Sequence, residues 1–145
     1  MIHWFWYAIV AAILYGLHQV FTKLAADQIG DGLGGFVVEI TAAFTIGLYL
    51  ISLWFTGTWN QRSTNTGIFY SVLTGLCVGV GTIFFFLLFQ KGAPLSAVPM
   101  VLAGGAALMG IVGIIFFKEP LSWFRSLGIL LSIVGLVLLR FSPTE

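Results

Sequence analysis

Charged residues are so scarce in this chain that most of its surface cannot face water. Only 8% of the 145 residues are Asp, Glu, Lys or Arg, whereas 59% are hydrophobic. A soluble domain carries about 25% charged residues. A disordered chain needs low hydrophobicity, so this composition excludes that class as well. The composition therefore predicts an integral membrane protein.

Five apolar stretches are long enough to cross a bilayer as helices, which takes about 20 residues each. Helices are expected because each one satisfies its backbone hydrogen bonds within its own segment. The predicted fold is an all-α integral membrane bundle of five transmembrane helices, in a single domain over residues 1–145. The predicted spans cover about residues 4–21, 36–55, 67–89, 95–117 and 121–139.

Short polar or glycine-rich segments separate the predicted spans. The first of them, residues 25–35, contains two Asp and four Gly and matches the pattern GxGxxG over residues 30–35. A dinucleotide site of that pattern needs a preceding strand, so we expect a flexible connector instead. The connections at Pro94 and Pro120 are so short that the last three helices should be antiparallel to their sequence neighbours.

The basic residues divide evenly between the two sides of the membrane that these spans imply. Lys and Arg in short loops normally set orientation, so an even division selects neither direction. This favours a chain that inserts both ways and pairs with an inverted copy. The alternative is that Arg125 lies inside the fifth helix and does not count. The two groups are Arg62, Lys118 and Arg125 on the N-terminal side, and Lys23, Lys91 and Arg140 on the other.

Glu39 is the acidic residue that falls within a predicted span. Ionisable residues inside membrane helices commonly mark sites for protons, ions or substrates. Glu39 is expected about one turn into the second span, among small side chains, where it could exchange a proton or bind a cationic substrate. The alternative is a glutamate in the first helical turn, stabilised there by the helix dipole.

His18 is the second candidate for binding a proton or substrate. It shares one face of the first span with Tyr15 and Thr22, and Gln19 is adjacent to it. Histidine changes charge near physiological pH, which suits proton coupling. The alternative is a structural histidine held by hydrogen bonds. Because the first two spans run antiparallel, His18 and Glu39 should lie toward the same membrane side and could meet in one cavity.

Small residues recur at helical spacing and predict close packing of helices in lipid. Packing within the chain is expected for the third and fourth spans, and either a bundle edge or a dimer contact for the fifth. The residues are Gly16 in the first span, Gly75 and Gly79 in the third, Gly110 in the fourth, and Gly128, Ser132 and Gly135 in the fifth.

Proline and glycine predict that the fourth span is the most deformable helix. Pro99 is expected one turn into it, where it would remove a backbone hydrogen bond, and Gly104 and Gly105 follow. Bendable helices often line transporter cavities. The alternative is a proline that is simply tolerated near a helix start.

Enzymatic, metal and cofactor sites are not predicted. The sequence holds no P-loop, HExxH, CxxC or serine-nucleophile motif, and Cys77 is its single cysteine. A net charge of +1 offers no basic patch for nucleic acid. The expected partners are the lipid bilayer, a small-molecule substrate and a second copy of the chain.

Two groups of residues resemble a known transporter family. The first is Tyr15-Gly16-Leu17-His18, followed by Phe21 and Lys23-Leu24-Ala25. The second is Gly92-Ala93-Pro94-Leu95-Ser96-Ala97, followed by Glu119, Leu121, Ser122, Gly128 and Gly135. Together they make nearly the whole chain similar to a single EamA-type domain of the drug/metabolite transporter superfamily. His18 stands where the family has a small polar residue, Arg125 where Gln is frequent, and Glu39 near a position that is commonly Arg.

This resemblance implies one half of an inverted-repeat transporter, because most members carry two such halves in one chain. The second, inverted half would then come from another molecule. The sequence thus predicts a small, proton-coupled secondary active transporter of a metabolite or drug, acting as an antiparallel homodimer in a bacterial or archaeal inner or plasma membrane. The alternatives are pairing with a different five-helix subunit, a non-transporting structural or regulatory subunit, and a lipid-flippase subunit.

Overall fold

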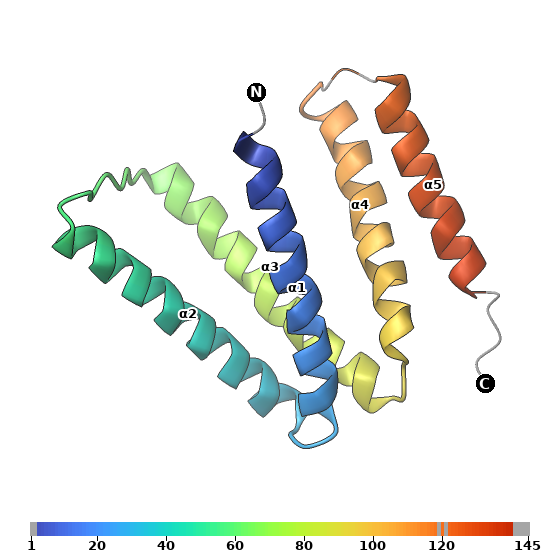
Figure 1. Cartoon of the computed structure of the whole chain (residues 1–145), viewed down its shortest axis with the longest axis horizontal. Helices are drawn as coiled ribbons and strands as arrows, with labels where there is room; N and C mark the ends of the chain where they lie inside the picture. The colour runs from blue at the N-terminus through green and yellow to red at the C-terminus, as the bar shows by residue number, and fades with distance from the viewer. Residues whose placement is uncertain (1–2, 119, 121, 141–145) are drawn as a thin grey trace. The chain divides into compact units, whose positions relative to one another are not determined.

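The structure, a computed structural model, describes residues 3–118, 120 and 122–140 (Figure 1). In this part of the chain all regular secondary structure is helical, as predicted. The α-helices are α1 (His3–Ala26), α2 (Asp31–Phe55), α3 (Asn65–Gln90), α4 (Val98–Ile115) and α5 (Trp123–Arg140), and a short 3₁₀ helix, η1 (Leu95–Ala97), precedes α4.

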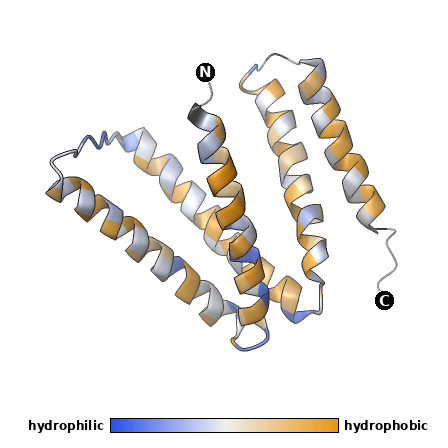
Figure 2. Ribbon diagram, viewed as in Figure 1, coloured by the Kyte–Doolittle hydropathy of each residue, from blue (hydrophilic) through white to orange (hydrophobic). Residues whose placement is uncertain are grey.

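Four segments are long and apolar enough to cross a membrane, which indicates a multi-pass membrane protein. Figure 2 shows hydrophobic residues along the length of the helices, with hydrophilic residues gathered in their connections. The α5 helix carries a shorter apolar stretch, Ser126–Gly135, so a fifth span stays a prediction. The four segments are Trp4–Ala26, Asp31–Phe55, Asn65–Gln90 and Leu95–Ile115.

The chain forms two compact units, divided between Ala93 and Pro94. The first unit contains α1, α2 and α3, which all contact one another. These three helices come together near the α1–α2 connection and spread apart toward their other ends (Figure 1). The buried side chains and glycines of this unit lie at the converging end: Gln19, Thr22, Ala26, Gly34, Gly35, Thr82, Phe86 and Phe89. A hydrogen bond of 3.0 Å from Gln90 Nε2 to Ile29 O also joins α3 to the connection.

The first connection is much shorter than predicted, because α2 begins at Asp31 rather than at Phe36. The expectation of a flexible glycine-rich connector over residues 25–35 was therefore wrong. Gly34 and Gly35 are buried against α3: a Cβ at Gly34 would lie 2.7 Å from Cζ of Phe86. Glycine at this point lets the two helices approach closely, and packing outweighs its weak helix propensity.

The second connection agrees with its prediction. Residues 56–64 separate α2 from α3, and Thr64 is the N-cap of α3. Its hydroxyl accepts a hydrogen bond of 3.0 Å from the Gly67 amide, which satisfies one of the free donors at the helix start.

The second unit is the antiparallel pair α4 and α5, preceded by η1 (Figure 1). Gly110 lies in this contact, since a Cβ there would be 2.7 Å from Cδ1 of Ile129. Pro99 lies in the first turn of α4 rather than one turn into it, because residues 95–97 form the separate 3₁₀ helix. A first-turn proline removes no intrahelical hydrogen bond, which favours the tolerated-proline alternative. Gly104 and Gly105 continue the helix, and its deformability stays a prediction.

Several predicted packing residues have no close neighbour inside their own unit. A Cβ at Gly16, Gly75, Gly79 or Gly135 would meet no side chain or remote backbone of the described residues there within 4 Å. The expected packing of Gly75 and Gly79 within the chain is therefore not seen in the first unit. Glu119 and Leu121 lie outside the described residues, as do the side chains of Arg125, Ser132 and Arg140.

The close approach at Gly34 can be tested by adding one methyl group. Gly34→Ala should lower the free energy of unfolding by about 1–3 kcal/mol, because the new Cβ collides with the fully buried Phe86 ring. Gly47→Ala is the matched control on the same helix, where the Cβ meets nothing within 4 Å. Unfolding of both variants would be followed in detergent by circular dichroism, and equal stability would contradict this account of the α2–α3 contact.

Candidate functional site

Five polar side chains lie in the first unit where its three helices converge. We call this set the polar layer: His18, Gln19 and Thr22 of α1, Glu39 of α2, and Thr82 of α3. His18 lies eight residues before the last residue of α1, Glu39 eight after the first residue of α2, and Thr82 eight before the last residue of α3. At 1.5 Å per residue, each is about 12 Å from its helix end at the α1–α2 connection. The three residues therefore occupy one level.

A hydrogen bond between Glu39 and Thr82 joins α2 to α3. The Thr82 hydroxyl donates to Oε1 of Glu39 at 2.7 Å and also lies 3.0 Å from the backbone carbonyl of Val78. Thr82 is only 5% exposed. Hydrogen bonds to a charged group are about twice as strong as neutral ones, so an ionised Glu39 would be held firmly here.

The α1 side of the polar layer is buried and only partly hydrogen-bonded. Gln19 is 7% exposed and Thr22 is 2% exposed. The Thr22 hydroxyl donates to the His18 carbonyl at 2.8 Å, which satisfies that hydroxyl. In contrast, Gln19 Oε1 and His18 Nδ1 are buried without a hydrogen-bond partner. Buried polar atoms in proteins nearly always have partners, so these two are places where a ligand can bind.

No basic residue of the described part of the chain forms an ion pair with Glu39. The nearby base on α1, Lys23, places its Nζ 5.5 Å from the centroid of the Phe89 ring, in a cation–π contact. Oε2 of Glu39 has no hydrogen-bond partner within the described residues. An ionised carboxylate away from water is costly without a counter-charge. The layer can therefore accept a proton or a cation.

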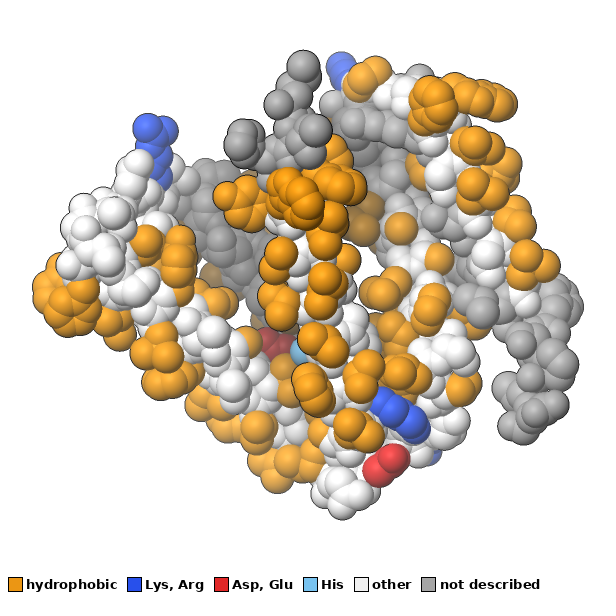
Figure 3. Space-filling model, viewed as in Figure 1, with side chains coloured by type: hydrophobic (Ala, Val, Ile, Leu, Met, Phe, Trp, Pro, Cys, Tyr) orange, Lys and Arg blue, Asp and Glu red, His pale blue; other side chains and the backbone are white. Residues whose placement is uncertain are grey.

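The structure corrects the predicted depth of Glu39. It lies more than two turns into α2 rather than one, because the helix begins five residues earlier than expected. Stabilisation by the helix dipole acts within the first turn, so the alternative that relied on it is wrong. The prediction that His18 and Glu39 lie toward the same end of the helices agrees with their common level. Figure 3 shows that hydrophobic side chains cover most of the face in its view, with few charged side chains among them.

Two residues differ from the predicted site. Tyr15 was grouped with His18 by helical spacing, but its side chain is 69% exposed and lies outside the buried set. Thr82 was not predicted, although it is the hydrogen-bond donor to Glu39. Because α3 also contains Thr74, the sequence alone could not identify Thr82 as the partner of Glu39.

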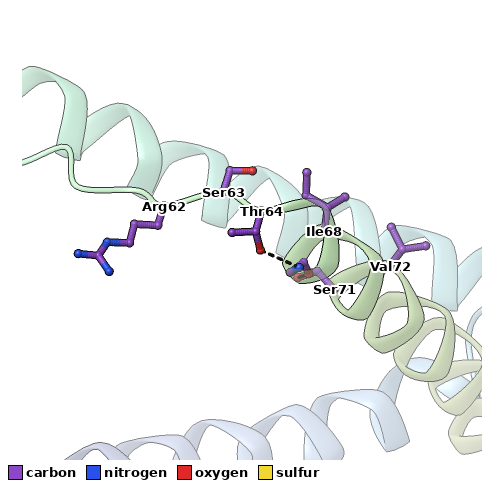
Figure 4. A pocket seen from close by; sticks show the side chains of 7 residues that line it. Arg62, Ser63, Thr64, Ile68, Ser71 and Val72 are labelled. Atoms are coloured by element: carbon purple, nitrogen blue, oxygen red, sulfur yellow. Dashed lines mark hydrogen bonds between the residues drawn. The ribbon is translucent and has the colours of Figure 1, made fainter.

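A shallow pocket at the start of α3 is the main polar alternative (Figure 4). Its lining side chains are exposed, and its Thr64 hydroxyl is already used to cap the helix. The pocket therefore lacks the buried, unpartnered atoms of the polar layer. Within the described residues there is no group of three His, Cys, Asp or Glu side chains that could hold a metal ion. The pocket is lined by Arg62, Ser63, Thr64, Gly67, Ile68, Ser71 and Val72.

Comparison with known proteins finds a relative of similar length. No family model matches the chain, and no solved structure matches it. The chain is 26% identical over 135 residues to an uncharacterized protein of Methanocaldococcus jannaschii. The alignment covers 92% of this chain and 93% of the relative, so the two chains are similar along nearly their full lengths.

Proposed function

We propose that this chain is a subunit of a small secondary active transporter, and that the polar layer binds its coupling proton or its cargo. The observation that carries the proposal is Glu39, which lies more than two turns inside an apolar helix with Thr82 as its hydrogen-bond donor. A charge at the bilayer centre costs at least about 2.5 kcal/mol, and such residues usually mark a pathway for ions or substrates.

The helix lengths would place the polar layer within the hydrocarbon of a bilayer. α1, α2 and α3 have 24, 25 and 26 residues, which makes each about 36–39 Å long. The hydrocarbon core is about 30 Å thick, so a layer about 12 Å from the helix ends would lie well below the headgroups. In this proposal α5 forms a fifth span, with 18 residues and a length of about 27 Å.

A second copy of the chain would complete the transporter. The helices of the first unit spread apart away from the polar layer, and Gly16, Gly75 and Gly79 leave small-residue faces uncovered within that unit (Figure 1). The even division of the six basic residues supports an inverted partner. Inverted repeats with a binding site between them are a general transporter plan, and the resemblance to a single EamA-type half supports it here. The relative of similar length also has room for one such half.

Proton coupling through Glu39 can be tested by electrical recording from proteoliposomes on a solid support. A panel of amino acids, organic acids, amines and nucleosides would be applied under an imposed pH gradient. At least one compound should produce a gradient-dependent current, and Glu39→Gln should reduce that current at least tenfold because it removes the titratable group. Asp31→Asn is the matched control, since it removes the same charge eight residues away at the start of α2. The proposal fails if no compound produces a current, or if the Glu39→Gln current equals that of the unchanged chain.

The antiparallel homodimer can be tested with a reporter fused after Glu145. We expect the reporter on both sides of the membrane in comparable amounts, since the basic residues select neither orientation. A reporter found on one side only would exclude the inverted homodimer. In that case co-purification of a second membrane protein would support a half-transporter with a different subunit.

A further inference from the structure

We propose that the polar layer selects ligands that carry a primary ammonium group. This inference rests on the proposed function, because it names the class of cargo that the same site would accept. It follows from three properties of the layer: its free hydrogen-bond acceptors, its charge and the side on which it is closed.

Three hydrogen-bond acceptors of the polar layer are uncommitted. Oε2 of Glu39 and Oε1 of Gln19 have no hydrogen-bond partner in the described part of the chain. His18 Nδ1 is also without one, and it is an acceptor when the ring proton is on Nε2. The hydroxyl protons of Thr22 and Thr82 are already directed to other oxygens. A ligand that carries N–H donors can satisfy these acceptors, and an ammonium group has three such donors.

The charge of the layer favours a cation. Glu39 forms no ion pair with the described Lys, Arg or His residues. The titratable groups of α1 at this end are His18 and Lys23, and Lys23 lies over the Phe89 ring. The titratable side chains of α3 are Tyr70 and Cys77, both exposed outside the layer. Besides Glu39, α2 has Asp31 at its start and the exposed Tyr49. An ammonium group would neutralise the carboxylate in a region of low dielectric, where the attraction is strong.

The layer is closed on the side of the α1–α2 connection. Phe86 is completely buried and lies four residues beyond Thr82 toward the end of α3, which is about 6 Å. Phe89 is buried one turn further along, beneath Lys23. A ligand would therefore place its ammonium group against the layer and extend its apolar part toward the spreading ends of the helices.

Three probes with the same butyl chain separate charge from hydrogen bonding. Binding of n-butylammonium, butyltrimethylammonium and n-butanol would be measured by calorimetry on the full chain in lipid nanodiscs. We expect n-butylammonium to bind at least tenfold more tightly than either of the others, because only it combines a positive charge with N–H donors. Glu39→Gln and Gln19→Met should each weaken its binding at least tenfold, whereas Asp31→Asn and Thr74→Val should not.

The outcomes separate this inference from the transport proposal. The near-isosteric variants Glu39→Gln and Gln19→Met are checked for unchanged unfolding midpoints, so that lost binding reports on the site. Equal affinity for the primary and quaternary ammonium probes, or unchanged binding after Glu39→Gln, would overturn the inference. Glu39-dependent transport of another compound without butylammonium binding would also overturn it and leave the transport proposal standing. Selective, Glu39-dependent binding without transport would support the ligand class and count against the transport proposal.

Discussion

The packing of the first unit depends on the hydrogen bond that holds the Glu39 carboxyl group among apolar helices. Glu39 finds its donor in Thr82 at 2.7 Å, and this bond requires α2 and α3 to lie close together. Gly34 and Gly35 make that approach possible, and Phe86 fills the space beside them. α1 then buries Gln19 and Thr22 against the same end. The most polar part of the first unit is thus also its most buried part. In a soluble protein, by contrast, the buried core is mostly apolar.

This arrangement would allow even a chain of 145 residues to form one side of the proposed binding site. Three helices converge at one end and close it with aromatic rings, while their other ends separate (Figure 1). In the proposed transporter, the first unit supplies a closed end, a carboxylate and unpartnered acceptors, and the remaining wall of the site comes from other helices. An inverted second copy would supply that wall and a second carboxylate at the opposite depth.

The sequence predicted the helices better than the site. Continuous apolar runs identified the helical segments, since their period and length depend only on local composition. The start of α2 was misjudged because residues 31–35 are helical despite their glycines, and Gly34 and Gly35 pack against α3, which no local pattern reports. The depth of Glu39 was misjudged with it, because that depth is counted from the helix start. Thr82 could not be predicted, because its bond to Glu39 depends on the register between two helices that are 43 residues apart at this point.

The most direct test of this account is the stability of Thr82→Val relative to Thr74→Val. Both hydroxyls lie within hydrogen-bond distance of a carbonyl of α3, but of the two only the Thr82 hydroxyl also reaches Glu39, to which it donates at 2.7 Å. Reversible unfolding in detergent should show that Thr82→Val costs about 0.6–1.7 kcal/mol, from the average to the maximum for interhelical hydrogen bonds in a membrane protein. Thr74→Val should stay within about 0.5 kcal/mol, and Thr82→Ser should retain most of the stability. If Thr82→Val is no more destabilising than Thr74→Val, the Glu39–Thr82 bond does not hold the helices together and the account is contradicted.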